Sequence, residues 1–268
     1  ISHSEYSNEV NSKPFELTEL IYIPAGSFIM GYLYDTHHTV TISKDFYMSK
    51  FEVTQKEWTD IMGSNPSVDH GVGLNFPVYN TNWYSSLVYC NIRSIAEGLT
   101  PCYTISGTTD PNQWGSIPIV SNSIWDAVEC NWSVNGYRLA TEAEWEYVAQ
   151  YNNSRTYPWG ETTPSSTLCN YNNNVGASTE VGSYPAGNSK LGLSDMGGNV
   201  AEWVWDWFDY YSTSSQIDPT GPSSGTQRIL RSIWWSFSDP SGLRCVLRSR
   251  TTPISATYMN GLRIVRLP

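Results

Sequence analysis

The chain has 268 residues and carries 15 Lys and Arg against 25 Asp and Glu, a net charge of −10. This balance argues against nucleic acid or an anionic membrane surface as a partner, because either would be repelled. Charged residues make up only 15% of the chain and aromatic residues 14%, a composition that excludes intrinsic disorder. No stretch approaches the ~18 apolar residues of a transmembrane helix.

We expect a flexible lead over residues 1–17, followed by a single α+β domain over residues 18–268. A tight turn is predicted at residues 25–27. Short apolar runs bounded by turn residues predict the first strands. These runs are Leu20–Pro24, Phe28–Gly31, Thr39–Ile42 and Phe46–Val53.

Two capping boxes predict helices, because a Thr followed three residues later by Glu satisfies the first backbone N–H groups of a helix. Thr54 and Glu57 begin the first of these helices, and Gly63 ends it. Thr141 and Glu144 begin the other, which continues through Trp145 and Val148.

A further helix fits residues 83–97, where apolar side chains recur near the helical period. Thr81 or Asn82 would cap its N-terminus, and Gly98 would follow its last turn. After Tyr151 we expect short strands joined by long loops, over 152–189 and 211–226 among others.

Alternation along a strand places Trp203, Trp205 and Trp207 on one face, with Val204 and Asp206 on the other. A stripe of three tryptophans is more typical of a hydrophobic core than of a ligand platform. We therefore assign these tryptophans to the core.

Other polar clusters are interpreted structurally. Glu142, Glu144 and Glu146 are assigned to helix capping and to the helix surface. His37 and His38 adjoin in a strand, so they point to opposite faces and cannot ligate one metal together. We expect both histidines on the surface.

The five cysteines are far apart and contain no C-x-x-C pair, which argues against a zinc or dithiol redox site. Two alternatives remain, namely buried thiols that pack as small apolar residues, or one structural disulfide with unassigned partners. The cysteines are Cys90, Cys102, Cys130, Cys169 and Cys245.

Six segments, in this order, resemble the formylglycine-generating-enzyme (sulfatase-modifying factor) family. The resemblance implies the subtype of the C-type lectin fold found in these enzymes, with two main helices around a small twisted sheet and long loops. The segments are Ile23–Gly31, Glu52–Trp58, Gly136–Tyr147, Tyr157–Gly160, Gly192–Trp203 and Gly261–Arg266.

At the matching positions of this chain, the residues that perform catalysis in that family are not present. Its enzymes oxidise a cysteine by means of copper held on two nearby cysteines, and soft thiolates suit Cu(I). The matching positions fall near Trp235 and Pro240, and Cys245 matches a structural cysteine. We predict that the chain is not an enzyme. The alternative is a relative of the cysteine oxidases.

The family resemblance also implies a structural calcium site, although no cofactor is required. Position by position, it would use the side chains of Asp195 and Glu202 with the carbonyls of Gly198 and Val200, all oxygen ligands. The alternative is a plain turn in which Asp195 caps and Glu202 makes a buried hydrogen bond. The sequence signatures of calcium-dependent sugar binding are absent, so a calcium-dependent glycan binder is kept only as an alternative function.

The C-terminal segment, about 228–266, combines a recognisable frame of the family with residues of no consistent type. This contrast resembles the variable proteins of diversity-generating retroelements, most closely the treponemal variable protein. The frame residues are Arg228, Arg231, Trp235, Cys245, Gly261 and Arg263. The ligand-binding residues that the resemblance implies are Trp234, Ser236, Phe237, Ser238, Asp239, Leu243, Val246, Arg248, Arg250, Thr252, Ile254, Ser255, Thr257 and Tyr258.

These patterns predict a non-enzymatic ligand-binding protein whose C-terminal segment is diversified to bind varied partners. Substitution is tolerated at exposed positions, because core changes typically cost about 2–5 kcal/mol. The partner would be a variable protein or cell-surface ligand. The resemblance implies secretion or display at the cell surface through a lipid anchor upstream of Ile1. An inactive family member with an ordinary fixed ligand is the alternative.

Overall fold

A computed structural model describes residues 18–31, 37–151 and 155–268, and the predicted N-terminal lead lies outside these ranges. The helices are α1 (Gln55–Met62), α2 (Trp83–Ala96), α3 (Ser123–Asp126) and α4 (Glu142–Gln150), with 3-10 turns η1 (Pro111–Gln113), η2 (Pro185–Gly187) and η3 (Pro240–Leu243). The strands are β1 (Leu20–Ile23), β2 (Gly26–Met30), β3 (His38–Ile42), β4 (Phe46–Ser49), β5 (Tyr103–Thr104), β6 (Glu129–Cys130), β7 (Arg138–Leu139), β8 (Ala201–Trp207), β9 (Gln216–Ile217), β10 (Arg228–Arg231), β11 (Arg248–Thr251), β12 (Asn260–Leu262) and β13 (Ile264–Arg266).

The three main helices begin where their caps predict. Thr54 forms the capping box of α1 with Glu57, and Gly63 ends that helix in the left-handed conformation, at φ 80°. Thr141 forms the same box with Glu144 at the start of α4. Helix α2 is capped by Asn82, which settles the alternative left by the sequence.

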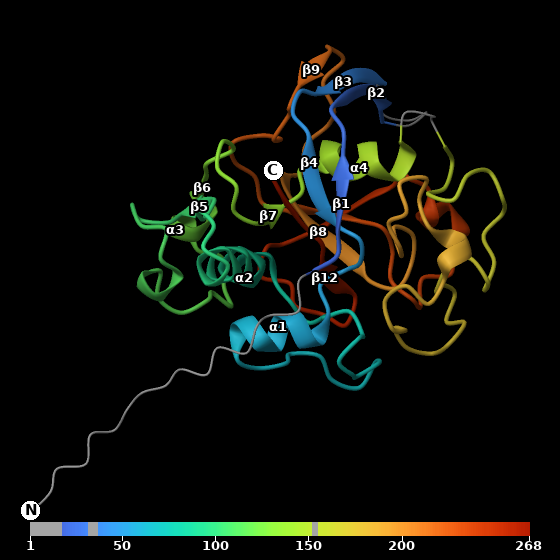
Figure 1. Ribbon diagram of the computed structural model, residues 1–268, viewed down its shortest axis with the longest axis horizontal. Coiled ribbons are helices and arrows are strands. Elements are labelled where there is room, and N and C mark those ends of the chain that lie inside the picture. Colours follow the sequence, from blue (N-terminus) through green and yellow to red (C-terminus); the bar gives the residue numbers. More distant parts are fainter. Residues whose placement is uncertain (1–17, 32–36, 152–154) are drawn as a thin grey trace, which may run out of the picture.

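Four small sheets carry the fold. One has the order β1-β4-β13-β7, and a second has the order β11-β10-β8-β12. Strands β2 and β3 form a hairpin with β9 added alongside, and Figure 1 shows this unit at the end of the molecule away from α1. The first turn is shorter than predicted, because β2 begins at Gly26 and pairs with β3 from that residue onward.

Strand β8 divides the two main hydrophobic clusters. Trp203 packs into the cluster that contains α2, with Trp205 at its margin, and Val204 packs into the cluster beside α4. Trp83 of α2 donates a hydrogen bond from Nε1 to the carbonyl of Val204 at 2.9 Å, and its ring faces Trp205 and Trp207. The assignment of the tryptophan stripe to the core is confirmed.

Helix α4 is buried along its whole length, from Glu142 to Gln150. The prediction that its acidic residues cover a helix surface is therefore wrong for Glu142 and Glu146, although Glu144 does complete the capping box. His38 is also buried, with only His37 exposed, so the two histidines do point to opposite faces but only one reaches the surface.

All five cysteines are free thiols in this structure. Cys130 is half-buried and the other four are buried, as expected for thiols that pack as small apolar residues. Cys102 precedes β5 and donates a hydrogen bond of 3.2 Å to the carbonyl of Gly136, and Cys130 ends β6, which pairs with β5.

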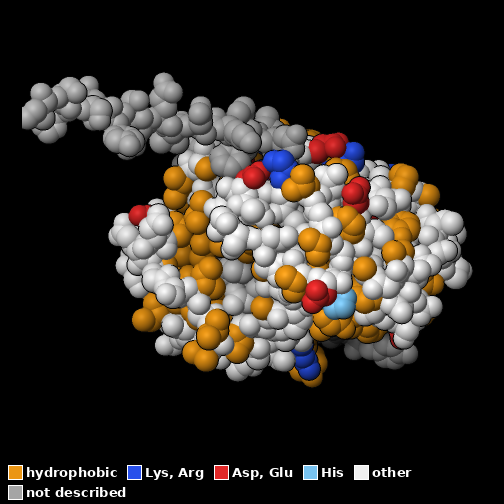
Figure 2. Space-filling model, turned by 90° about the horizontal axis from the view of Figure 1, so that it is seen from below, with side chains coloured by type: hydrophobic (Ala, Val, Ile, Leu, Met, Phe, Trp, Pro, Cys, Tyr) orange, Lys and Arg blue, Asp and Glu red, His pale blue; other side chains and the backbone are white. Residues whose placement is uncertain are grey.

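The architecture is the predicted α+β class, with few helices, small sheets and long connections (Figure 1). Among the residues that the structure describes, no helix is long and apolar enough to span a bilayer. The face seen in Figure 2 carries many apolar and uncharged side chains and few charged ones.

Candidate functional site

The frame arginines of the C-terminal segment are buried anchors. Arg231 is 0% exposed and forms ion pairs of 3.0 Å with both Glu142 and Glu146 of α4. Arg228 lies between the rings of Trp83 and Trp207, with its guanidinium carbon 3.6 and 3.5 Å from their centres. These contacts hold β10 against both hydrophobic clusters, so the frame fixes the backbone from which the predicted binding residues project.

Ser232 and Ile233 form the start of the loop after β10. Ser232 adopts φ 64°, a left-handed conformation that favours glycine, and its Oγ accepts a hydrogen bond of 2.9 Å from the N–H of Gly198. Ile233 is buried and lies where a Cβ on Gly242 would come within 2.7 Å of it. Gly242 therefore makes the room that Ile233 needs.

Aromatic side chains gather beyond this turn, in what we call the aromatic cluster: His70, Trp234, Trp235, Phe237 and Tyr258. Trp234 and Phe237 meet edge to face with ring centres 4.9 Å apart. The ring of His70 lies 4.7 Å from Tyr258 and 5.4 Å from Trp235. All except the buried Trp235 are partly exposed, which is how interface anchors are arranged.

Two predicted binding residues form a second group on β11. The Arg248 guanidinium pairs with Glu142 at 2.7 Å and lies 4.0 Å from the ring centre of Tyr211. That of Arg250 lies 3.7 Å from the ring centre of Phe208. Both arginines are thus held over aromatic rings, at a place distinct from the aromatic cluster.

One predicted binding residue is misplaced. Leu243 is 1% exposed and packs with Cys169 and Ile233 in a small hydrophobic cluster, so it is a core residue and not a ligand contact. The error arises because residue type alone does not show that η3 turns this side chain inward. The other predicted positions are exposed or half-buried, namely Ser236, Ser238, Asp239, Val246, Thr252, Ile254, Ser255 and Thr257.

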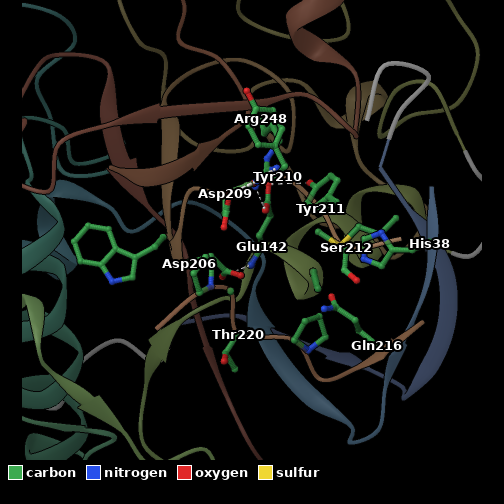
Figure 3. A pocket seen from close by; sticks show the side chains of 16 residues that line it. His38, Glu142, Asp206, Asp209, Tyr210, Tyr211, Ser212, Gln216, Thr220 and Arg248 are labelled. Carbon is green, nitrogen blue, oxygen red and sulfur yellow. Dashed lines mark hydrogen bonds and ion pairs between the residues drawn. The ribbon is translucent and has the colours of Figure 1, made fainter. Parts of the chain in front are cut away.

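A cavity of about 360 Å³ lies next to Arg248, between β8, the start of α4 and the segment 209–222 (Figure 3). Asp206 lines it and accepts a hydrogen bond of 2.7 Å at Oδ2 from the backbone N–H of Glu142. Burial, reinforced by the charge of Glu142, raises the pKa of Asp206 to about 8. The acid is therefore mostly protonated at neutral pH.

The proposed calcium turn is occupied by an ion pair. Glu202 is buried and accepts hydrogen bonds from Arg263, at 2.9–3.2 Å, and from Trp145 Nε1 at 2.7 Å. Asp195 accepts a hydrogen bond from the N–H of Gly182 at 2.6 Å. Within the described ranges, no three His, Cys, Asp or Glu side chains are placed to hold a metal. The calcium site stays a prediction, and the Glu202 carboxylate is engaged as in the alternative of a turn with a buried hydrogen bond.

We therefore expect the melting temperature to be the same in millimolar calcium and in EDTA, because Arg263 already neutralises Glu202. Thermal unfolding followed by circular dichroism is the measurement. A rise of several degrees with calcium, lost on adding EDTA, would show that the ion displaces Arg263 and would restore the family prediction.

Two residues beside the predicted binding residues could not be identified from the sequence. His70 enters the aromatic cluster from a loop more than 160 positions before Trp235, and no local pattern links the two. For Asp206, the sequence provided one indication of its position, because the strand alternation placed it on the face opposite the tryptophans. Its burial against α4 depends on tertiary packing and could not be predicted from that alternation.

The comparisons with known proteins agree with this geometry. A family profile described as the sulfatase-modifying factor enzyme 1-like domain matches residues 6–268. The chaperone protein LppX of Paenibacillus barcinonensis is 38% identical over 215 residues, which are 73% of this chain and 74% of that protein. The mouse formylglycine-generating enzyme is 27% identical over 298 residues, covering 96% of this chain and 79% of that enzyme.

The same architecture is present in a solved structure. Treponema denticola variable protein 1 superimposes with a TM-score of 0.82 at 32% identity, over 93% of this chain and 95% of that protein. The likeness to the treponemal variable protein that the C-terminal segment predicts is confirmed.

Proposed function

The chain belongs to the sulfatase-modifying factor family, and from this premise we propose that it is a non-enzymatic variable protein whose C-terminal segment binds a partner. The family also contains enzymes such as the mouse relative. The positions that match their catalytic cysteines fall near Trp235 and Pro240, and neither side chain can hold copper. We therefore base the proposed function on the variable protein and not on the oxidases of the family.

The proposal rests on the difference in burial between the frame residues of the C-terminal segment and the residues between them. Its frame residues Arg228, Arg231 and Arg263 are buried in ion pairs or stacked between rings. Most residues between them are exposed or half-buried, and several are aromatic residues or arginines, the types enriched at binding hot spots. A scaffold of this kind tolerates substitution at the surface while the frame maintains stability.

We further propose that the protein is displayed at the cell surface through a lipid anchor, where a diversified segment would meet varied protein or cell-surface partners. The acidic net charge supports a partner that is neither nucleic acid nor an anionic lipid surface.

The test is to sequence the coding DNA of residues 225–268 in many isolates, together with any nearby near-copy of that segment. We expect substitutions at the partly exposed positions, Trp234 and Tyr258 among them, with adenines at the matching places in the copy. Leu243, Cys245 and the frame arginines are expected to stay constant because they are buried. Variation that is absent, or that falls equally on Arg231 and Leu243, would contradict the proposal.

A further inference from the structure

The cavity beside Arg248 has the size and lining of a small binding site. Its volume of about 360 Å³ lies within the range of small-molecule pockets, at the small end. Figure 3 shows Asp206, Asp209, Tyr211 and Gln216 around it. Tyr210, at 78% exposed, also lines it, and Asp209 is exposed, so the cavity reaches the molecular surface.

The walls of this cavity already bind one guanidinium group, that of Arg248. Its Nη2 pairs with the carboxylate of Glu142 at 2.7 Å, its Nη1 donates to the carbonyl of Asp209 at 2.9 Å, and the rings of Tyr211 and Phe208 face it. Carboxylates and aromatic faces are the groups that recognise organic cations. The contacts of Arg248 therefore show that this lining can bind a guanidinium group.

Two acidic side chains of the cavity, Asp206 and Asp209, still have oxygen atoms that can accept a hydrogen bond from a ligand. Asp206 is only 5% exposed and lines the cavity, yet the described residues give it one hydrogen bond, at Oδ2, and leave Oδ1 without a donor. The carboxylate of Asp209 adds a second acceptor at the rim. Because the side chain lines the cavity and Oδ1 has no donor among the described residues, a ligand donor that enters the cavity can bind to it.

We propose that this cavity receives a cationic side chain of the partner, a lysine or an arginine, between Asp206 and Asp209. This inference rests on the proposed function and names the chemistry of the partner. The net charge of −10 would draw a basic partner toward the protein. An uncharged ligand such as a sugar would leave the exposed carboxylate of Asp209 without a matching charge.

The bound cation should couple to the protonation of Asp206. A positive charge within about 4–6 Å favours the ionised acid, so binding releases its proton and becomes tighter as the pH rises through about 8. We expect the affinity to increase by about tenfold between the protonated and the ionised state. The charged groups that act on Asp206 are Glu142 and Glu144 of α4, Arg248 of β11 and Arg228 of β10.

The experiment titrates the whole protein with N-acetylarginine amide and with N-acetylcitrulline amide, which has nearly the same shape without the charge. Binding is followed by NMR at a pH below and a pH above 8. We expect the arginine compound to bind in the millimolar range and the citrulline compound not to bind. Asp206→Asn should remove the pH dependence, and Asp209→Asn should weaken binding by about tenfold.

The matched control is Glu129→Gln, an exposed carboxylate on β6, which should leave binding unchanged. Equal binding of both compounds, binding of neither, or binding of a methyl glycoside in their place would overturn the inference. Because Asp209 is exposed, Asp209→Asn tests the site even if Asp206→Asn fails to fold. None of these results depends on variation among isolates, so failure here is distinguishable from failure of the proposed function.

Discussion

Replacing Arg263 with alanine is expected to lower the free energy of unfolding by about 3–5 kcal/mol. The guanidinium is 1% exposed and binds Glu202 through Nε and Nη2. It also donates to the carbonyls of Ser49, Lys50 and Ser194, at 2.6–2.8 Å. Truncation would leave a buried carboxylate without its cation and three carbonyls without donors, which is the costly way to break a buried ion pair.

Urea unfolding of the purified variant measures this effect, and Arg266→Ala is the matched control. Arg266 is half-buried and donates to the carbonyl of Leu267, so its loss should cost about 1 kcal/mol or less. Adding Glu202→Gln to Arg263→Ala should recover part of the loss, because it removes the stranded charge. A cost below about 1 kcal/mol for Arg263→Ala would mean that water or a cation takes the place of the guanidinium.

Local chemistry made the helices and the tryptophan strand predictable. A capping box acts over four residues, and strand alternation acts over two, so Thr54, Thr141 and Trp203 could be placed without any tertiary information. The family segments then supplied the fold. The same reasoning failed for Glu142 and Glu146, because their partner Arg231 lies more than 80 positions away and the sequence does not show that both faces of α4 are covered.

The predicted binding residues could be located as a segment of the sequence, but their arrangement in space could not be predicted. The contrast between the frame and residues of no consistent type located this segment, yet the structure divides its aromatic and arginine side chains between the aromatic cluster and the β11 arginines. Residues from other loops, such as His70 and Tyr211, complete both groups. Which side chain turns inward, as Leu243 does, depends on the path of η3 and is fixed only by packing.

The Asp206→Asn variant should be more stable than the parent protein at alkaline pH and nearly equal to it at acid pH. The pKa of Asp206 is raised from 3.8 to about 8 in the folded state, by burial first and then by the charge of Glu142. Below about pH 4 both the folded and the unfolded chain hold the proton, and the carboxyl costs nothing. Between about pH 4 and pH 8 the unfolded chain loses the proton first, so the free energy of unfolding falls as the pH rises.

Above about pH 8 the penalty is complete, and its size is on the order of 5 kcal/mol. Asparagine keeps an oxygen that can accept from the N–H of Glu142, as Oδ2 does at 2.7 Å, and its amide resembles the protonated acid. Urea unfolding at a series of pH values should show the two proteins diverging through that range, while Glu129→Gln follows the parent. Parallel curves would show that Asp206 is ionised in the folded protein at neutral pH, so that its charge must already be neutralised by solvent or by a bound cation.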